Sequence, residues 1–253
     1  MKNFYRFMIL WCAVLLFCGC SNDSSPDKDL TAAVTLAKKG EWQEAARIAA
    51  AAAEKNPHIS APLLIQALAY EKSGELNKAI DLASRCAENF PEDFTAQYIC
   101  GRLYSKDPLR QDKAFTTLEK AIKLRKGDVN TLILLCTIGT ANNEPGTLVY
   151  LNDLVQKSDL SDADTARVYF LRGLYLRNVE HKLGDAFQSM YRAGNYCRKE
   201  NPELLCDIAV FLEENGNRDV ATFHYKRFLA LYKAVPDHDP ALIRFAEQKL
   251  KRK

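Results

Sequence analysis

The chain has 253 residues, of which 47% are hydrophobic and 26% are charged. Such a composition is that of a folded chain and excludes wholesale disorder, collagen and a coiled coil. The formal net charge is only +3, which argues against a nucleic-acid partner. The histidines are few and far apart along the chain, so composition offers little for a metal or catalytic centre: His58, His181, His224 and His238.

Residues 1–19 have the pattern of an export signal. Lys2 and Arg6 supply positive charge, and residues 7–18 are a run of twelve apolar residues. As a helix this run is about 18 Å long, well short of the ~30 Å hydrocarbon core of a bilayer. It is therefore interpreted as the apolar region of a signal peptide.

The end of this segment resembles the lipobox of bacterial lipoproteins. Gly19 and Cys20 follow the apolar run and precede the polar residues 21–27. The resemblance implies cleavage before Cys20 and attachment of fatty-acyl chains such as palmitate to that residue. Residues 20–28 would then be a lipid-bearing tether, and two acyl chains suffice for stable anchoring. A plain secretory peptide and an uncleaved anchor are the alternatives.

Cleavage would leave 253 − 19 = 234 residues and remove two basic groups, so that 33 bases face 32 acids. The mature protein would carry a formal charge of +1, and partners attracted by net charge become less expected.

The rest of the chain is an internal repeat. Gly40 recurs as Gly74 and Pro57 as Pro91, each after 34 residues. Five helical stripes share the spacing i, i+4, i+7, typical of one buried helix face. They are Ala45-Ala49-Ala52, Ala79-Ala83-Cys86, Ala114-Leu118-Ala121, Ala186-Met190-Ala193 and Ala221-Tyr225-Phe228. Another amphipathic helix precedes each stripe, with a small residue such as Ala67, Gly101 or Gly173 where two backbones can approach closely.

This two-helix unit resembles the tetratricopeptide repeat, whose period is 34 residues. The resemblance implies an all-α, right-handed α-solenoid over residues 29–235, followed by a C-terminal capping helix over 236–253. It gives about six helix-turn-helix units: 26–59, 60–93, 94–128, 129–163, 164–201 and 202–235. The fourth unit departs from the pattern, because Leu148 replaces the expected Ala and Asn152 occupies an apolar position. The fifth has an insertion at 178–183, so its register is open.

Three helix starts are predicted from capping patterns. Asn201 and Asp239 each precede a proline, which suits the first helical position. Ser161 followed by Asp164 resembles a capping box.

No catalytic motif is present. The sequence has no phosphate-binding glycine loop, no zinc-protease or nucleophile-elbow motif and no CxxC pair. His238 is expected in a solvated linker, His58 in an exposed turn, and His224 at a surface or partly buried position. We therefore predict no enzyme, no cofactor, no metal, no nucleic acid and no small-molecule substrate.

Five cysteines follow Cys20, an odd number that leaves at least one thiol unpaired or paired between chains. Cys86, Cys100 and Cys136 fall on core positions. Cys197 and Cys206 flank the connection at 201–202 and could form a disulfide.

The first helices of the units are predicted to line a concave groove. Positions one repeat apart form a ladder of mostly apolar residues: Leu30, Leu64, Tyr98, Ile133 and Phe170. The next turn places Val34, Leu68, Arg102, Thr137 and Leu174 together, and another turn places Lys38, Lys72 and Lys106. The predicted partner-binding residues are Leu64, Leu68, Lys72, Tyr98, Arg102, Lys106 and Phe170. Mutual packing and ordinary solvation of these side chains are the alternative interpretation.

Such a surface suits an extended or helical segment of another protein. The carboxylate clamp known in this repeat family is not expected, because Leu30 and Val34 occupy its face. The function expected from these resemblances is a scaffold of the bacterial cell envelope that binds another envelope protein or peptide. It would be lipid-anchored in the cell membrane or outer membrane, facing the periplasm or exterior. In architecture it is similar to pilotin-like lipoproteins of pilus and secretin assembly and to lipoproteins of outer-membrane protein assembly. The alternatives are a soluble exported module without lipid and an enzyme with an unrecognised site.

Overall fold

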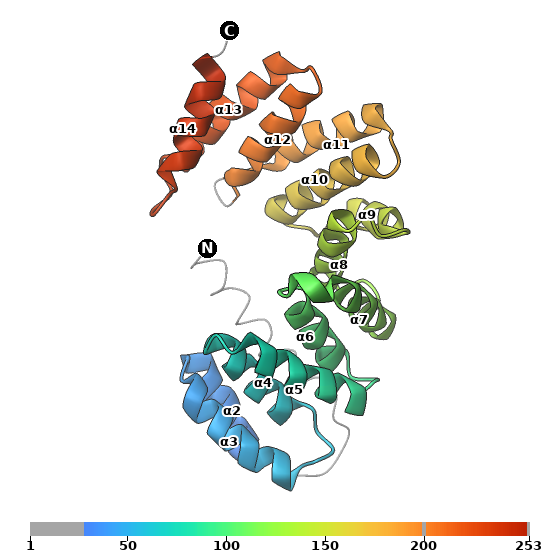
Figure 1. The fold of residues 1–253 in the computed structure, drawn as a ribbon, viewed down its shortest axis with the longest axis vertical. Helices are drawn as coiled ribbons and strands as arrows, with labels where there is room; N and C mark the ends of the chain where they lie inside the picture. Colours follow the sequence, from blue (N-terminus) through green and yellow to red (C-terminus); the bar gives the residue numbers. More distant parts are fainter. Residues whose placement is uncertain (1–27, 199–200, 252–253) are drawn as a thin grey trace. The chain divides into compact units, whose positions relative to one another are not determined.

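The computed structural model describes residues 28–198 and 201–251 (Figure 1). Over these residues it contains thirteen α-helices, one short 3-10 helix and no strand. The predicted all-α fold is confirmed. The predicted signal peptide, Cys20 and nearly all of the predicted tether lie outside the described residues. The chain divides into two compact units, and the boundary in the sequence falls between Thr131 and Leu132.

The first unit consists of consecutive helix pairs. The pairs are α2 (Lys28–Lys39) with α3 (Trp42–Lys55), α4 (Ala61–Lys72) with α5 (Leu76–Asn89), and α6 (Phe94–Tyr104) with α7 (Gln111–Leu124). Gly40 and Gly74 lie in the turns within the first two pairs, with φ of 84° and 80°. Glycine reaches this left-handed region without strain, which explains its recurrence after one repeat. The 3-10 helix η1 (Pro108–Arg110) stands in the third turn.

The second unit also consists of consecutive helices, and its first residue, Leu132, lies within α8 (Val129–Ala141). Its further helices are α9 (Thr147–Val155), α10 (Asp162–Asn178), α11 (Leu183–Tyr196), α12 (Glu203–Glu214), α13 (Arg218–Tyr232) and α14 (Pro240–Lys251). Helix α10 packs on α9 and α11, α12 packs on α11 and α13, and α14 packs on α13. Ala246 of α14 is fully buried in this core. Lys249 of α14 also donates to the Glu213 carboxylate over 2.6 Å, which ties α14 to α12.

The predicted small-residue stripes form the core of both units. All fifteen side chains of the five stripes are buried. The preceding helix comes close to them: a Cβ added at Gly101 would lie 2.7 Å from Cγ of Leu118, so only glycine fits there. The periodicity in the sequence therefore identified the packed faces of the second helices correctly.

The departure in the fourth repeat is a shift of register. In α9 the buried positions are Thr147, Leu151 and Leu154, which keep the spacing i, i+4, i+7 but begin one residue before Leu148. Asn152 consequently lies on the exposed side, where its Oδ1 accepts a hydrogen bond from Nε of Arg172 over 3.0 Å. The fifth unit places its extra residues in a longer α10 and the turn at 179–182.

Two of the three predicted helix caps are confirmed. Oγ of Ser161 accepts from the backbone N–H of Asp164 over 3.1 Å, and Oδ1 of Asp239 accepts from that of Ala241 over 2.8 Å. The cap at Asn201 is wrong: α12 begins at Glu203. Asn201 instead accepts from the backbone N–H of Arg198 over 3.1 Å, because its side chain turns back towards the end of α11.

Candidate partner-binding surface

The first helices of the repeats in the first unit form a continuous row. Helix α4 contacts both α2 and α6, the preceding and following first helices. All three helices have basic residues in the last turn, namely Lys38 and Lys39 in α2, Lys72 in α4 and Arg102 in α6. We call this row the first-helix surface: the exposed and half-buried side chains of α2, α4, α6 and the turn that carries Lys106.

The apolar part of the first-helix surface is narrower than predicted. Leu68 and Tyr98 are half-buried, and the Tyr98 ring stacks on Phe94 with centroids 5.9 Å apart. Leu64 has only 1% of its surface exposed, so its predicted place on the groove surface is corrected. Helix α4 contacts four other helices, α2, α3, α5 and α6, and Leu64 is buried among them.

The predicted basic residues belong to an ion cluster that centres on Glu71 of α4. Arg102 donates from Nη1 and Nη2 to the two carboxylate oxygens over 2.8 and 2.7 Å. Nζ of Lys106 lies 2.5 Å from Oε1 of the same carboxylate. Burial by itself would raise the pKa of Glu71, but the hydrogen bonds and charges of Arg102 and Lys106 lower it to about 2. The carboxylate is therefore ionised at neutral pH, and the cluster carries one net positive charge.

This cluster fixes the position of its cations. The side chains of Glu71 and Arg102 are 9% and 13% exposed, whereas that of Lys106 is 36% exposed. The paired bonds between a guanidinium and a carboxylate hold both groups in one plane. Lys72, one residue further along α4, has its Nζ 5.8 Å from the ring centre of Trp42, at the start of α3.

Val34, another predicted groove residue of the first unit, is buried in α2 with 6% of its surface exposed. Ile133, Thr137, Phe170 and Leu174 of the predicted groove belong to the second unit. Phe170 lies in α10 and is half-buried, packing with Leu174 against the core of that unit. Ile133 is buried, and Thr137 is exposed and donates to the carbonyl of Ile133 over 2.7 Å. The continuity of the ladder from Tyr98 to Phe170 stays a prediction.

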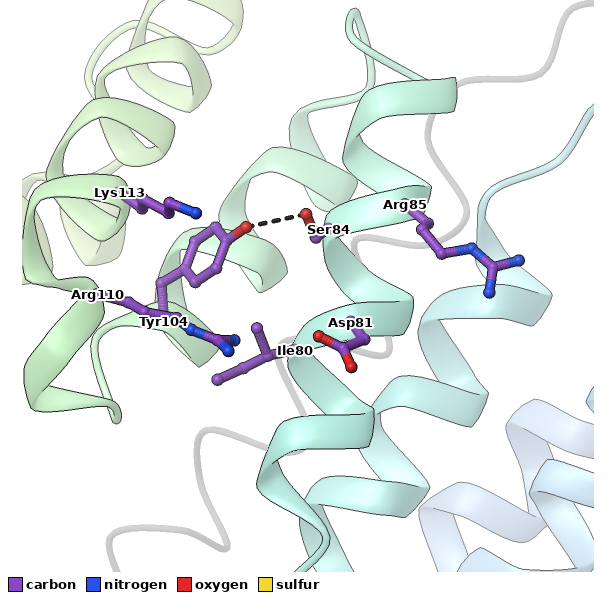
Figure 2. A pocket seen from close by; sticks show the side chains of 7 residues that line it. All are labelled: Ile80, Asp81, Ser84, Arg85, Tyr104, Arg110 and Lys113. Atoms are coloured by element: carbon purple, nitrogen blue, oxygen red, sulfur yellow. Dashed lines mark hydrogen bonds between the residues drawn. The ribbon is translucent and has the colours of Figure 1, made fainter.

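A separate cleft of about 510 Å³ lies between α5 and the start of α7 (Figure 2). It is lined by Ile80, Asp81, Ser84, Arg85, Tyr104, Arg110 and Lys113. The Tyr104 hydroxyl donates to Ser84 over 2.9 Å, and Figure 2 shows Lys113 directed towards that tyrosine and Arg85 directed away. Arg110 is paired with Asp107 at 3.2 Å. The cleft thus has charged side chains of both signs, and one of them, Arg110, is paired with a neighbouring acid.

The cysteines after Cys20 are buried free thiols. Burial raises the pKa of Cys86, Cys100 and Cys136 to about 12, and that of Cys197 and Cys206 to about 11. A thiol with so high a pKa is a poor nucleophile at neutral pH. Cys197 and Cys206 are not joined in this structure.

Two histidines differ from each other in their surroundings. Nδ1 of His238 donates to the carbonyl of Val235 over 3.0 Å, in the linker before α14. His224 is buried, with 1% of its surface exposed, so the predicted surface or partly buried position is wrong. Over the described ranges, no group of three or more His, Cys, Asp or Glu side chains is arranged to hold a metal ion.

Sequence reasoning missed Glu71, the acceptor at the centre of the ion cluster. Glu71 and Arg102 are 31 residues apart, close to one repeat, and this spacing could have revealed the pair. Among the helices that the structure describes, none is both long and apolar enough to span a bilayer.

Comparison with known proteins supports the repeat assignment. Residues 63–93 match the family model of the tetratricopeptide repeat. This range coincides with the second predicted unit, 60–93. A search of curated proteins finds no match to this chain.

Solved structures with the same fold cover most of the chain. YrrB, a TPR protein with an unusual peptide-binding site, is 19% identical over 79% of this chain and 97% of its own, with a TM-score of 0.57. PilF of Pseudomonas aeruginosa is 14% identical over 88% of this chain and 96% of its own, with a TM-score of 0.61. The APC/C hetero-tetramer Cut9–Hcn1 is 16% identical over 98% of this chain and 46% of the matched chain, with a TM-score of 0.60. At such identities the likeness concerns the fold, and the chain has the fold of tetratricopeptide-repeat proteins.

Proposed function

We propose that this protein is a membrane-anchored interaction scaffold of the bacterial cell envelope, which holds a segment of another envelope protein on the first-helix surface. The observation that carries the proposal is the juxtaposition of half-buried Leu68 and Tyr98 with the fixed cations of the Glu71 cluster. Partner-binding surfaces typically combine an aromatic anchor with positioned charged groups at its rim.

Two further observations support an interaction role. The fold is that of repeat proteins, whose stacked helix pairs produce extended binding surfaces. Among the proteins with this fold, YrrB has a peptide-binding site and Cut9 belongs to a hetero-tetramer. The buried high-pKa thiols and the absence of a metal-binding group among the described residues offer nothing that favours an enzyme.

The membrane anchor rests on the sequence around Cys20, where Gly19 and the preceding apolar run resemble a lipobox. We place the protein in the cell membrane or outer membrane, with the repeats facing the periplasm or exterior. A role in pilus and secretin assembly or in outer-membrane protein assembly is the finer proposal. The likeness in fold to PilF of Pseudomonas aeruginosa is compatible with the former.

The test is capture of partners from cross-linked native membranes by the wild-type chain and by a Tyr98→Ala, Lys72→Glu double variant. Both changes lie on the first-helix surface, so the amount of the main partner should fall by about tenfold or more. The control is Lys113→Glu, a charge reversal of the same kind in the cleft on α7, which should capture the partner normally. Equal recovery by the wild type and the double variant, with unchanged helical content, would contradict the proposed binding surface.

A further inference from the structure

The last turns of the first helices carry an excess of positive charge. Lys38, Lys39, Lys72, Arg102 and Lys106 lie on or next to these turns. The nearby acids Glu75 and Asp107 are already paired with Lys78 and Arg110 respectively. Glu71 is the acid that pairs with two of these cations, Arg102 and Lys106.

Lys106 is the cation of the Glu71 cluster with most room for a ligand. Its Nζ gives one of three N–H donors to Glu71, at 2.5 Å, and its side chain is 36% exposed. Because Glu71 is also bound by both terminal nitrogens of Arg102, the ammonium group is held at a set place before any partner arrives. The cluster still carries a net charge of +1 after this internal pairing.

The apolar part of the surface lies on the same two helices. Leu68 lies one turn before Lys72 on α4, and Tyr98 lies one turn before Arg102 on α6. Since side chains four residues apart lie on one face of a helix, each apolar residue has a cation as its neighbour towards the C-terminal end.

We propose that the segment held on the first-helix surface contains an acidic residue close to an apolar residue. The carboxylate of the segment binds Lys106, and its apolar side chain packs on Leu68 and Tyr98. This inference rests on the proposed function and adds the chemistry of the partner. A carboxylate complements the net positive charge of the Glu71 cluster, whereas a basic segment would place like charge against the exposed Lys106.

The experiment selects displayed random 12-residue peptides on the purified chain. Selected peptides should carry Asp or Glu within about four positions of a large apolar residue, since this is the reach along one helical turn. The affinity of one selected peptide is then measured in two forms, with its acidic residue intact and with that residue changed by Asp→Asn or Glu→Gln. Each form is tested against four versions of the protein: the wild type, Lys106→Gln, Tyr98→Ala and Lys113→Gln. Lys113→Gln is the matched control, because that lysine lies in the other cleft.

Removing the peptide carboxylate should weaken binding to the wild type by about fivefold and have little effect on binding to Lys106→Gln. Lys113→Gln should behave as the wild type. A selection that returns no peptides, or peptides without acidic residues, would overturn the inference.

The variants separate this inference from the proposed function. Suppose that Tyr98→Ala abolishes binding but that the effects of removing the peptide carboxylate and Lys106 are independent. This result overturns the acidic partner and still supports the proposed binding surface. Binding that is unchanged in both Tyr98→Ala and Lys106→Gln overturns the acidic partner and the surface together.

Discussion

At the scale of single residues, His224 shows how the repeat packing controls ionisation. Neither ring nitrogen has a hydrogen-bond partner in the structure, and the ring lies against Gly194 of α11, where a Cβ would collide with it. Burial, and then the nearby charge of Arg227, lower the pKa of His224 to about 4. Arg227 itself donates to the carbonyls of Gly194 and Cys197 at the end of α11, so the imidazole is enclosed beside a fixed cation.

The first prediction follows from this lowered pKa. The unfolded chain protonates His224 below about pH 6.5, while the folded chain does so only near pH 4. The free energy of unfolding is therefore highest well above pH 6.5 and falls as the pH drops towards 4, by about 2 kcal/mol between pH 7 and pH 5. Urea unfolding of the wild type and of His224→Leu at several pH values measures this difference.

The comparison between variants isolates the contribution of His224. His224→Leu should lose less stability than the wild type between pH 7 and pH 5. His58→Leu, at an exposed position, is the control and should follow the wild type. If the free energy of unfolding depends on pH in the same way for the wild type and His224→Leu, the pKa of His224 is not lowered in the folded chain.

At the scale of elements, the ends of the helices determine how the repeats join. Oδ1 of Asp93 accepts from the backbone N–H groups of Thr95 and Ala96, over 2.7 and 3.3 Å, and so caps α6. Its other oxygen accepts from the hydroxyl of Ser60, the N-cap residue of α4. One carboxylate thus caps its own helix and ties it to the start of the preceding first helix.

The second prediction compares this cap with a simpler one. Ser161→Ala removes an N-cap bond and should cost about 1 kcal/mol of stability. Asp93→Ala removes the N-cap bonds and also leaves Ser60 without its acceptor, so its cost should be about 2 kcal/mol. Chemical unfolding followed by circular dichroism measures both. A smaller loss for Asp93→Ala than for Ser161→Ala would mean that the bond to Ser60 adds nothing.

At the scale of the whole molecule, the described residues begin at Lys28, the last residue of the predicted tether. Because Cys20 lies only eight residues before Lys28, the tether can extend over at most about 28 Å. A lipid at Cys20 would therefore hold α2, and the first-helix surface that begins there, close to a membrane.

The third prediction tests this anchor in cells. The wild-type protein should remain in the membrane fraction through a high-salt wash and be released by detergent, because lipid chains rather than charges hold it. Cys20→Ser should move to the soluble exported fraction or retain its signal peptide. Mass spectrometry of the native N-terminus should find an acylated Cys20; a free, unmodified Cys20 or an intact Met1 would exclude the lipid anchor. A protein that washes off in salt would be the soluble exported module instead.

Much of the fold could be predicted from the sequence because the repeat is local. The spacing i, i+4, i+7 marks the buried face of one helix without knowledge of its neighbours, and all fifteen stripe residues are buried. Ser161 and Asp239 could be recognised because a cap bonds within its own first turn. Asn201 could not, because a competing bond with Arg198 occupies its side chain.

The candidate site was predicted less completely. Lys72, Tyr98, Arg102 and Lys106 lie on the surface of α4, α6 and the turn that follows, as their positions along the helices suggested. Leu64 lies on the same ladder but is buried, because α4 has neighbours on several sides. Periodicity identifies one packed face of a helix, whereas the number of faces that are covered depends on the adjacent repeats.

The helix-pair repeat, its 34-residue period and the small-residue core can be recognised in the amino-acid sequence alone. The one-residue register shift of α9, the burial of His224 and the pairing of Arg102 and Lys106 with Glu71 become visible only in the folded chain. The physical reason is the range of the interactions. Helix periodicity and capping act within a few residues, while register, desolvation and ion pairing depend on side chains brought together from different repeats.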